Sequence, residues 1–257
     1  MINKNDISIQ LYTARNFQPY SSILNFFSES GITNIELFGL ESLNIDDFKE
    51  MMDSLNLSSR STHVSFEALE DSLNIIKRAN KMNIQHIIVP APPAKSDNSK
   101  NQFSMNQEEW NIFGKNLSTY VSIFEDAGLT LGYHNHPYEF IPLPSGKLPI
   151  ECIMEHNEQL KFEIDLGWVI AGGADPLPWI ERYSNKIIAC HLKDFYSKDK
   201  DMFDMDNQSA VGDGYIEWKD IIDSIKQTNC ELFILEHDNP KDYKDYTLRS
   251  LKNLETI

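Results

Sequence analysis

Cysteine is scarce in this chain, and its cysteines form no recognisable pair. Cys152, Cys190 and Cys230 are widely spaced, each lies among apolar residues, and no CxxC spacing occurs. An odd number of isolated cysteines argues against a disulfide framework and against a thiolate zinc site. We therefore expect reduced, buried thiols that pack as small hydrophobic side chains.

Long apolar runs are also missing. No stretch reaches the roughly 18 apolar residues needed to cross a bilayer, and the opening residues MINKNDISIQ lack the apolar core of a secretory signal. We expect a soluble, cytoplasmic protein that has no membrane partner.

Positive charge is in deficit, because the formal net charge is −16 and no stripe of Lys and Arg is visible. Nucleic acid is not an expected partner, since proteins that bind it neutralise phosphates with clustered basic side chains. No GxGxxG or GxxxxGK[ST] loop follows an apolar run either. Dinucleotide and P-loop sites are therefore not predicted.

What the chain does have is a regular alternation of short apolar runs with helix-like segments. The predicted strands cover residues 7–11, 34–38, 57–64, 84–89, 130–134, 162–165, 187–191 and 231–236. The predicted helices cover residues 21–28, 46–55, 68–82, 106–127, 149–156, 176–183, 218–227 and 241–254. Strict alternation favours parallel strands joined by right-handed crossovers. Eight such units in 257 residues fit an α/β (β/α)8 TIM barrel, one domain over residues 1–257, better than an open doubly wound sheet.

Two polar segments between these elements are unusually long. Residues 94–104 follow the fourth predicted strand, and residues 194–214 follow the seventh. Loops of this length in a compact domain are usually functional. We expect each either to cover a pocket, to contact another subunit, or to be a plain surface loop.

Acidic and histidine side chains stand where three of the predicted strands end. Asp165 closes the run KFEID, His191 follows IIAC, and Glu236 follows LFIL. In a (β/α)8 barrel the C-terminal ends of the strands converge on one pocket. Mixed carboxylate and imidazole ligands suit Mn²⁺, Mg²⁺, Co²⁺ or Zn²⁺. The sequence therefore predicts a divalent-metal site, and a fourth ligand should come from the fifth strand, which offers His134, His136 or Glu139.

Other side chains near these strand ends are candidates for substrate contact. Trp168 is placed to form a wall of a sugar-sized pocket, although an aromatic side chain there can equally pack in the core. His63 ends the third strand and either contacts substrate or makes a structural hydrogen bond. Lys193 should point to the same side as His191, two residues earlier. It is either a partner for a developing oxyanion or a surface lysine.

Side-chain alternation also separates neighbours at the last strand. His237 is expected to face away from Glu236, because successive side chains along a strand point to opposite sides.

Several motifs together resemble the sugar phosphate isomerase/epimerase group of xylose-isomerase-like TIM barrels. The matching pieces run nearly from end to end: ISIQLYTAR, GITNIELFG, THVSF, LGYHNHPYEF, FEIDLGWVIAGGADPLPWI, IIACHLKDF, VGDGYIEWKDII and FILEHD. That group includes 3-epimerases, hydroxypyruvate isomerase and inosose dehydratase. The resemblance implies a divalent metal, commonly Mn²⁺ or Mg²⁺, at the barrel mouth and a small-molecule sugar substrate. Since barrels of this group often self-associate, a homo-oligomer is a further expectation.

The resemblance also implies roles for individual residues. By position, Asp165, His191 and Glu236 match the metal ligands of strands six, seven and eight. The strand-five ligand of the group is generally a glutamate, whereas this strand ends at His134 and the nearest carboxylate is Glu139. Either His134 replaces the glutamate or Glu139 reaches back to the metal.

Our assignment takes Glu139 as the fourth ligand. The side chains predicted to act in catalysis are His134, Glu236 and Lys193. Those predicted to bind substrate are His63, Asn135, His136 and Trp168.

Such a site would bind the carbonyl and the neighbouring hydroxyl of a ketose and stabilise the enediolate formed when an α-proton leaves. Glu236 or His134 would act as the base. The leading hypothesis is an isomerase or epimerase of a small ketose or sugar derivative. If a β-hydroxyl leaves instead, the chain is a lyase or dehydratase of a 3-keto-sugar, keto-glycoside or inosose.

Two remoter alternatives share the same barrel. An AP endonuclease-like nuclease needs a basic face and additional histidine ligands, and a catalytically idle binding module would not need an intact ligand set.

Overall fold

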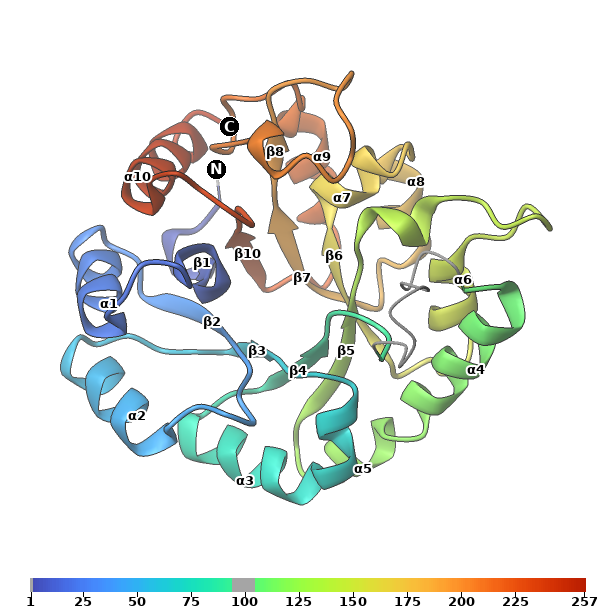
Figure 1. Cartoon of the computed structure of the whole chain (residues 1–257), viewed down its shortest axis with the longest axis horizontal. Coiled ribbons are helices and arrows are strands. Elements are labelled where there is room, and N and C mark those ends of the chain that lie inside the picture. The colour runs from blue at the N-terminus through green and yellow to red at the C-terminus, as the bar shows by residue number, and fades with distance from the viewer. Residues whose placement is uncertain (1, 94–104) are drawn as a thin grey trace.

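The computed structural model describes residues 2–93 and 105–257, and within them eight parallel strands close into a barrel (Figure 1). The barrel strands are β1 (Ile7–Gln10), β2 (Asn34–Phe38), β3 (Ser61–His63), β4 (His86–Val89), β5 (Thr130–His134), β6 (Lys161–Asp165), β7 (Ile187–Leu192) and β10 (Leu232–Leu235). Each strand pairs with the next one in the sequence, and β10 pairs with β1 to close the ring. The predicted α/β (β/α)8 barrel is confirmed.

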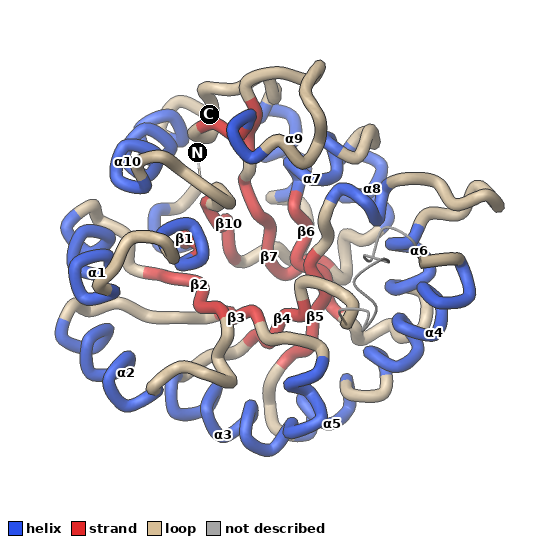
Figure 2. The backbone as a smooth tube through the Cα atoms, in the orientation of Figure 1, coloured by secondary structure: helices blue, strands red, loops and turns tan. Residues whose placement is uncertain are grey.

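The helices form a ring outside the strands, as the blue segments around the red barrel show in Figure 2. They are α1 (Tyr20–Glu29), α2 (Ile45–Ser54), α3 (Ser72–Met82), α4 (Gln107–Ser118), α5 (Val121–Asp126), α6 (Pro149–Met154), α7 (Leu166–Ala171), α8 (Pro176–Arg182), α9 (Trp218–Ile225) and α10 (Tyr243–Leu254). The described residues also contain the short 3-10 turns η1 (Lys4–Asp6), η2 (Leu11–Ala14), η3 (Glu67–Asp71), η5 (Pro137–Phe140) and η6 (Met205–Asn207).

Among the described residues, the buried apolar side chains form two clusters of very different size. One large cluster of buried apolar residues includes Ile9, Leu37 and Phe162, and it joins the strands to the surrounding helices. A separate small cluster contains Ala189, Leu232 and Ile234. Because side chains alternate along a strand, Ala189 and Ile234 point to the same side as the residues two positions further on. The small cluster is therefore an apolar floor beneath the polar strand ends.

The structure corrects some of the predicted boundaries. The single helix predicted over 106–127 is two helices, α4 and α5. Between them the hydroxyl of Thr119 donates to the carbonyl oxygen of Asn116 at 2.7 Å, a side-chain bond that competes with helix continuation.

Of the two long polar segments predicted from the sequence, the structure describes one. Residues 194–214 contain a hairpin of β8 (Asp194–Phe195) and β9 (Gln208–Ser209). The predicted loop over 94–104 lies outside the described residues.

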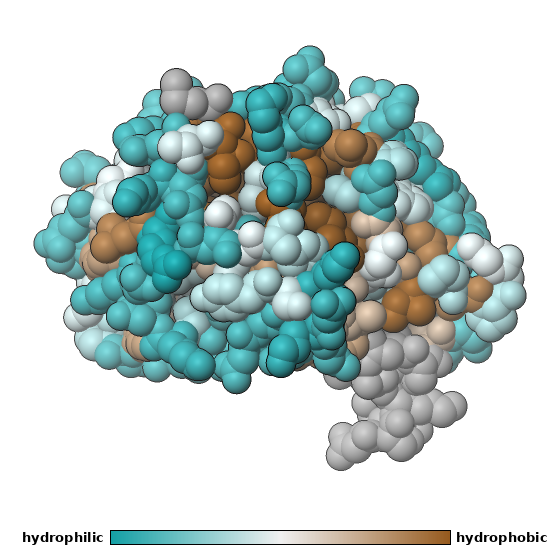
Figure 3. All heavy atoms as spheres, turned by 90° about the horizontal axis from the view of Figure 1, so that it is seen from above, coloured by the Kyte–Doolittle hydropathy of each residue, from teal (hydrophilic) through white to brown (hydrophobic). Residues whose placement is uncertain are grey.

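The face shown in Figure 3 is mostly polar, and the cysteines form no disulfide. Most residues on the face in Figure 3 are hydrophilic, and hydrophobic ones form small groups between them. No helix within 2–93 and 105–257 is long and apolar enough to span a bilayer. All three cysteines are free. Cys152 and Cys190 are buried as predicted, whereas Cys230 is only half-buried.

Candidate metal and substrate site

Four of the predicted side chains meet at the C-terminal mouth of the barrel. His134 ends β5, Asp165 ends β6, His191 lies one residue before the end of β7, and Glu236 directly follows β10. Parallel pairing aligns Asp165 with His191 and aligns His191 with Ile234, two residues before Glu236. One ligand-type atom from each of the four residues lies within 4.8 Å of the others, and all four are buried.

The chemistry of this group fits a divalent cation. The Oδ2 atom of Asp165 is buried without a hydrogen-bond partner, and the Nζ of Lys193 is 3.5 Å away. Burial, and then the neighbouring His191, lower the pKa of His134 well below its usual value, so its imidazole keeps a lone pair for a metal. A desolvated oxygen without a donor and a neutral imidazole are groups that a bound cation would satisfy.

The imidazole of His191 is oriented from both sides. Its Nδ1 lies 2.8 Å from Oε2 of Glu236, and its Nε2 lies 2.8 Å from Oε1 of Glu36. Glu36 also accepts from the Nε2 of Gln10 at 2.8 Å. A ring nitrogen that donates to a carboxylate leaves the other nitrogen directed at the metal. Glu36 therefore fixes which edge of His191 faces Asp165 and Glu236.

A second group of ligand-type atoms lies deeper in the barrel. It consists of His63, His134, Glu163 and His191. The Oε2 atom of Glu163 is 2.6 Å from Nε2 of His63, 3.1 Å from Nδ1 of His134 and 3.2 Å from Nε2 of His191. These are hydrogen-bond distances, so Glu163 joins three imidazoles into one network.

The charge state of His63 follows from the same network. Burial alone would lower its pKa, but the facing carboxylates of Glu36 and Glu163 outweigh burial and raise the pKa to about 10. His63 is therefore an imidazolium at neutral pH. Its Nε2 is held by Glu163, and among the described residues none is hydrogen-bonded to its Nδ1.

Sequence reasoning did not find Glu36 or Glu163. Both had a detectable signal, because Glu163 lies two residues before Asp165 and so faces the same side of β6. Glu36 occupies the middle of the otherwise largely apolar run NIELF.

Glu139, our predicted fourth ligand, lies outside both groups of ligand-type atoms. It sits in η5, where its carboxylate accepts from the hydroxyl of Tyr133 and, at 2.9 Å, from the backbone N–H of His136. Burial raises the pKa of Glu139 to about 8. The carboxylate caps its own turn instead of reaching back to the strand ends, and His134 takes the strand-five place in both groups.

Lys193 is buried beneath the acidic side of the site. Its Nζ lies 2.6 Å from Oδ2 of Asp238 and 3.0 Å from Oε2 of Glu236, and 4.3 Å from the centre of the Trp168 ring. Although burial opposes it, the surrounding carboxylates of Asp238, Glu236 and Asp165 raise the lysine pKa. Lys193 balances the carboxylates and is not among the described residues that line the cavity above them.

That cavity, of about 470 Å³, is lined by two of the four strand-end residues, His134 and Glu236. His63, His136 and Trp168, three of the four predicted substrate contacts, lie on its wall. The other described lining residues are Tyr12, Phe38, Gly39, Val64, Ser65, Pro90, Ala91, His134, Pro137, Tyr138, Phe203, Met205, Glu236 and Asp238. Phe203 and Met205 come from the segment 194–214, which therefore covers part of the pocket.

Asn135, the fourth predicted substrate contact, has a different position. It is fully buried, its Nδ2 donates to the carbonyl oxygen of Asp165 at 3.2 Å, and its Oδ1 accepts from the backbone N–H of Asp165 at 2.9 Å. Its amide joins β5 to β6 and sets the height of Asp165. No local sequence signal indicates this pairing, because it depends on the register of two strands.

The comparisons with known proteins agree with this architecture. The sequence profile of the xylose isomerase-like TIM barrels matches residues 21–257. The inosose dehydratase of Clostridium beijerinckii is 26% identical over 147 residues, covering 52% of this chain and 48% of that protein. The chain thus spans about half the length of the inosose dehydratases that it matches.

Solved structures resemble the whole barrel. A sugar phosphate isomerase/epimerase from Parabacteroides distasonis has a TM-score of 0.78 at 20% identity, covering 99% of this chain and 94% of that one. The probable 3-DHS dehydratase AsbF from Bacillus anthracis has a TM-score of 0.76 at 18% identity, with coverages of 97% and 98%. At such identities the likeness establishes the fold.

Proposed function

Because this chain belongs to the family of xylose isomerase-like TIM barrels, we propose that it is a divalent-metal-dependent enzyme acting on a small keto-sugar or keto-polyol. The observation that carries the proposal is the buried set His134, Asp165, His191 and Glu236, two of which line a cavity of sugar size. These four residues would hold Mn²⁺ or Mg²⁺, with Co²⁺ and Zn²⁺ also compatible with the donors. When bound, the cation would polarise the carbonyl of the substrate and favour loss of the adjacent proton.

The two sides of the cavity carry different proton-transfer groups. Glu236 follows β10, and His63 ends β3, three strands away around the ring. Burial raises the pKa of Glu236, but Lys193 and His191 outweigh burial and hold the pKa well below its usual range. Glu236 is therefore a carboxylate, able to accept the proton, whereas His63 is an imidazolium, able to donate one.

A carboxylate that accepts a proton, paired with an imidazolium that donates one, supports elimination of a β-hydroxyl. Glu236 would take the proton next to the carbonyl, and His63 would protonate the departing hydroxyl. Epimerisation at one carbon calls for two groups of matched proton affinity on opposite faces, and Glu139 does not supply the second carboxylate. Among the relatives, inosose dehydratase is itself named for a dehydration. We therefore propose a lyase of the dehydratase class.

Isomerisation, the leading hypothesis from the sequence, becomes the second candidate. The observation in its favour is that Glu236 is the carboxylate of the ligand group that lies on the described cavity wall, beside His134. One carboxylate is sufficient to move a proton between adjacent carbons.

The test uses purified protein with Mn²⁺ and a 3-keto-sugar or an inosose in D₂O. Elimination gives an unsaturated ketone, whereas isomerisation gives an isomer that has taken up solvent deuterium. In His63→Gln, elimination should slow by roughly 10²–10⁴-fold, the usual contribution of a general acid, while deuterium exchange next to the carbonyl persists. Glu236→Gln should abolish both. Full activity after removal of metal with EDTA would refute the proposal.

A further inference from the structure

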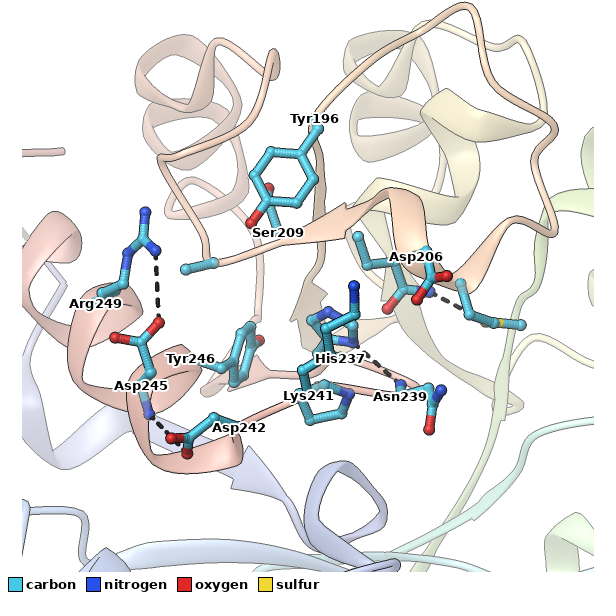
Figure 4. Close-up of a pocket in the computed structure, with 14 residues that line it drawn as sticks. Tyr196, Asp206, Ser209, His237, Asn239, Lys241, Asp242, Asp245, Tyr246 and Arg249 are labelled. Atoms are coloured by element: carbon cyan, nitrogen blue, oxygen red, sulfur yellow. Dashed lines mark hydrogen bonds and ion pairs between the residues drawn. The ribbon is translucent and has the colours of Figure 1, made fainter.

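A second, smaller cavity lies behind the wall of the first. It has a volume of about 190 Å³ and opens between the β8–β9 hairpin and α10 (Figure 4). Its described lining includes Tyr196, Met205, Ser209, His237 and Tyr246. We call it the hairpin pocket.

The chain that follows β10 forms the wall between the two cavities. Glu236 and Asp238 line the large cavity, whereas His237 lines the hairpin pocket. This is the alternation expected of extended backbone, and it confirms that His237 faces away from Glu236. Met205 lines both cavities, so its side chain forms a further part of the boundary between them.

One buried polar group on the lining of the hairpin pocket has no partner. Ser209 is 2% exposed, and its hydroxyl has no hydrogen-bond partner. The ring of His237 beside it is already engaged, because its Nδ1 accepts from the backbone N–H of Asn239 at 3.1 Å and the backbone of Gln208 is hydrogen-bonded to the same ring. A buried polar group without a partner destabilises the fold, so a ligand that pairs with the Ser209 hydroxyl would remove a cost already present.

The charges of the pocket argue against an anionic ligand. Arg249 is engaged by Asp213 at 2.7 Å and by Asp245 at 3.5 Å. Asp242 accepts from backbone N–H groups at the start of α10. The remaining charged groups, Lys241 and Asp206, have opposite signs. With three carboxylates and two cations on its described lining, the pocket carries no excess of positive charge, which disfavours an anion and is compatible with a neutral ligand.

Aromatic rings complete the pocket. Tyr246 is buried, Tyr196 is 57% exposed, and Figure 4 shows both rings beside the same opening as Ser209 and His237. A tyrosine ring offers an apolar face together with a polar tip, which suits the C–H face and the hydroxyls of a sugar. We propose that the hairpin pocket is a second binding site, separate from the metal site, for a neutral polyhydroxylated ring such as a sugar or a cyclitol.

Such a ring can come from two sources, namely the second ring of an extended substrate or a free polyol. Calorimetric titration of the Mn²⁺-loaded chain with glucose, with myo-inositol and with cellobiose distinguishes them. Two variants alter the hairpin pocket, Ser209→Ala and Tyr196→Ala, and Trp168→Ala alters the large cavity. Ser118→Ala is the matched control, because its hydroxyl is also buried without a partner but lies at the end of α4.

A free polyol predicts two binding events per chain for glucose or myo-inositol, one weakened by Ser209→Ala and the other by Trp168→Ala. A second substrate ring predicts one event for cellobiose that both variants weaken. Ser209→Ala should weaken the affected event about two- to tenfold, the worth of one hydrogen bond, and Tyr196→Ala should weaken it more. Neither should lower Tm, since the Ser209 hydroxyl bonds to nothing in the described fold and the Tyr196 ring is mostly exposed.

The proposal is overturned if none of the three sugars binds at tens of millimolar. It is also overturned if Ser209→Ala and Tyr196→Ala leave every affinity and stoichiometry equal to that of Ser118→Ala. Because the readout is binding, it stands apart from the dehydration assay. A chain that turns over no keto-sugar can still bind two rings, and an active enzyme can still lack the second site.

Discussion

His134→Gln and Glu139→Gln together decide which residue is the strand-five ligand. His134 belongs to the group of ligand-type atoms at the mouth of the barrel, together with Asp165, His191 and Glu236. The carboxylate of Glu139 is instead held by Tyr133 and by the backbone of His136. We expect His134→Gln to weaken divalent-metal binding strongly and Glu139→Gln to leave it almost unchanged. Both replacements end in an amide of similar size, so each variant serves as the control for the other.

The size of the effect can be worked out from linkage. Loss of a residue that only orients a ligand lowers metal affinity about 10- to 100-fold, so loss of a ligand itself should cost roughly 100-fold or more. Metal at about 1,000 times its Kd stabilises a fold by about 4.1 kcal/mol. At the same metal concentration a protein that binds about 100-fold more weakly is stabilised by only about 1.4 kcal/mol.

The assay is thermal unfolding with and without Mn²⁺. At about 2–4 °C per kcal/mol for a domain near this size, saturating metal should raise Tm by about 8–16 °C in the unaltered chain and in Glu139→Gln. In His134→Gln the rise should be only about 3–6 °C. If Glu139→Gln lost the metal-dependent rise and His134→Gln kept it, the ligand assignment from the structure would be wrong and the one from sequence resemblance right.

Three further outcomes follow from buried groups. Burial raises the pKa of Glu139 to about 8 in the fold, so this carboxyl group ionises at a lower pH in the unfolded chain. Stability should therefore fall by up to about 1.4 kcal/mol per pH unit between about 5 and 8. Urea titrations across this range should show that the slope disappears in Glu139→Gln. Lys193→Met should destabilise the metal-free protein by about 3–5 kcal/mol, since it leaves buried carboxylates unpaired. Mn²⁺ should then raise the Tm of this variant more than it raises the Tm of the unaltered chain. An equal rise would count against the charge-balancing role of Lys193. Gly167→Ala should cost about 1–3 kcal/mol in denaturant unfolding, because the new Cβ would clash with the backbone carbonyl of Lys193, and a neutral result would contradict the close approach of α7 to β7.

The parts of the site that could be predicted are those that depend on chain order alone. Asp165, His191 and Glu236 each stand where an apolar run ends, and barrel closure brings such positions together whatever the detailed packing. The same reasoning separated His237 from Glu236, because alternation is a property of any extended chain.

The parts that could not be predicted depend on contacts across strands. Glu139 was expected to reach the metal, but the hydroxyl of Tyr133 and one backbone N–H hold it in its turn. Asn135 was expected to bind substrate, but the register of β5 against β6 sets its amide on the main chain of Asp165. In both cases a short polar side chain found backbone partners nearby, and nothing in the local sequence distinguishes that outcome from a functional one.

The deeper layer of the barrel gives the strongest reason to regard the site as functional. Glu36 and Glu163 are completely buried, and one carboxylate oxygen of each has no hydrogen-bond partner. Apolar side chains of similar volume would stabilise a barrel interior at least as well as a buried ionic network does, so stability does not account for this layer. What the layer does is hold the rings of His63 and His191 by their Nε2 atoms, so that the Nδ1 of His191 faces the ligand group and His63 stays charged at the cavity wall. Replacing both glutamates with leucine should therefore leave a folded chain that has lost the metal-dependent rise in Tm.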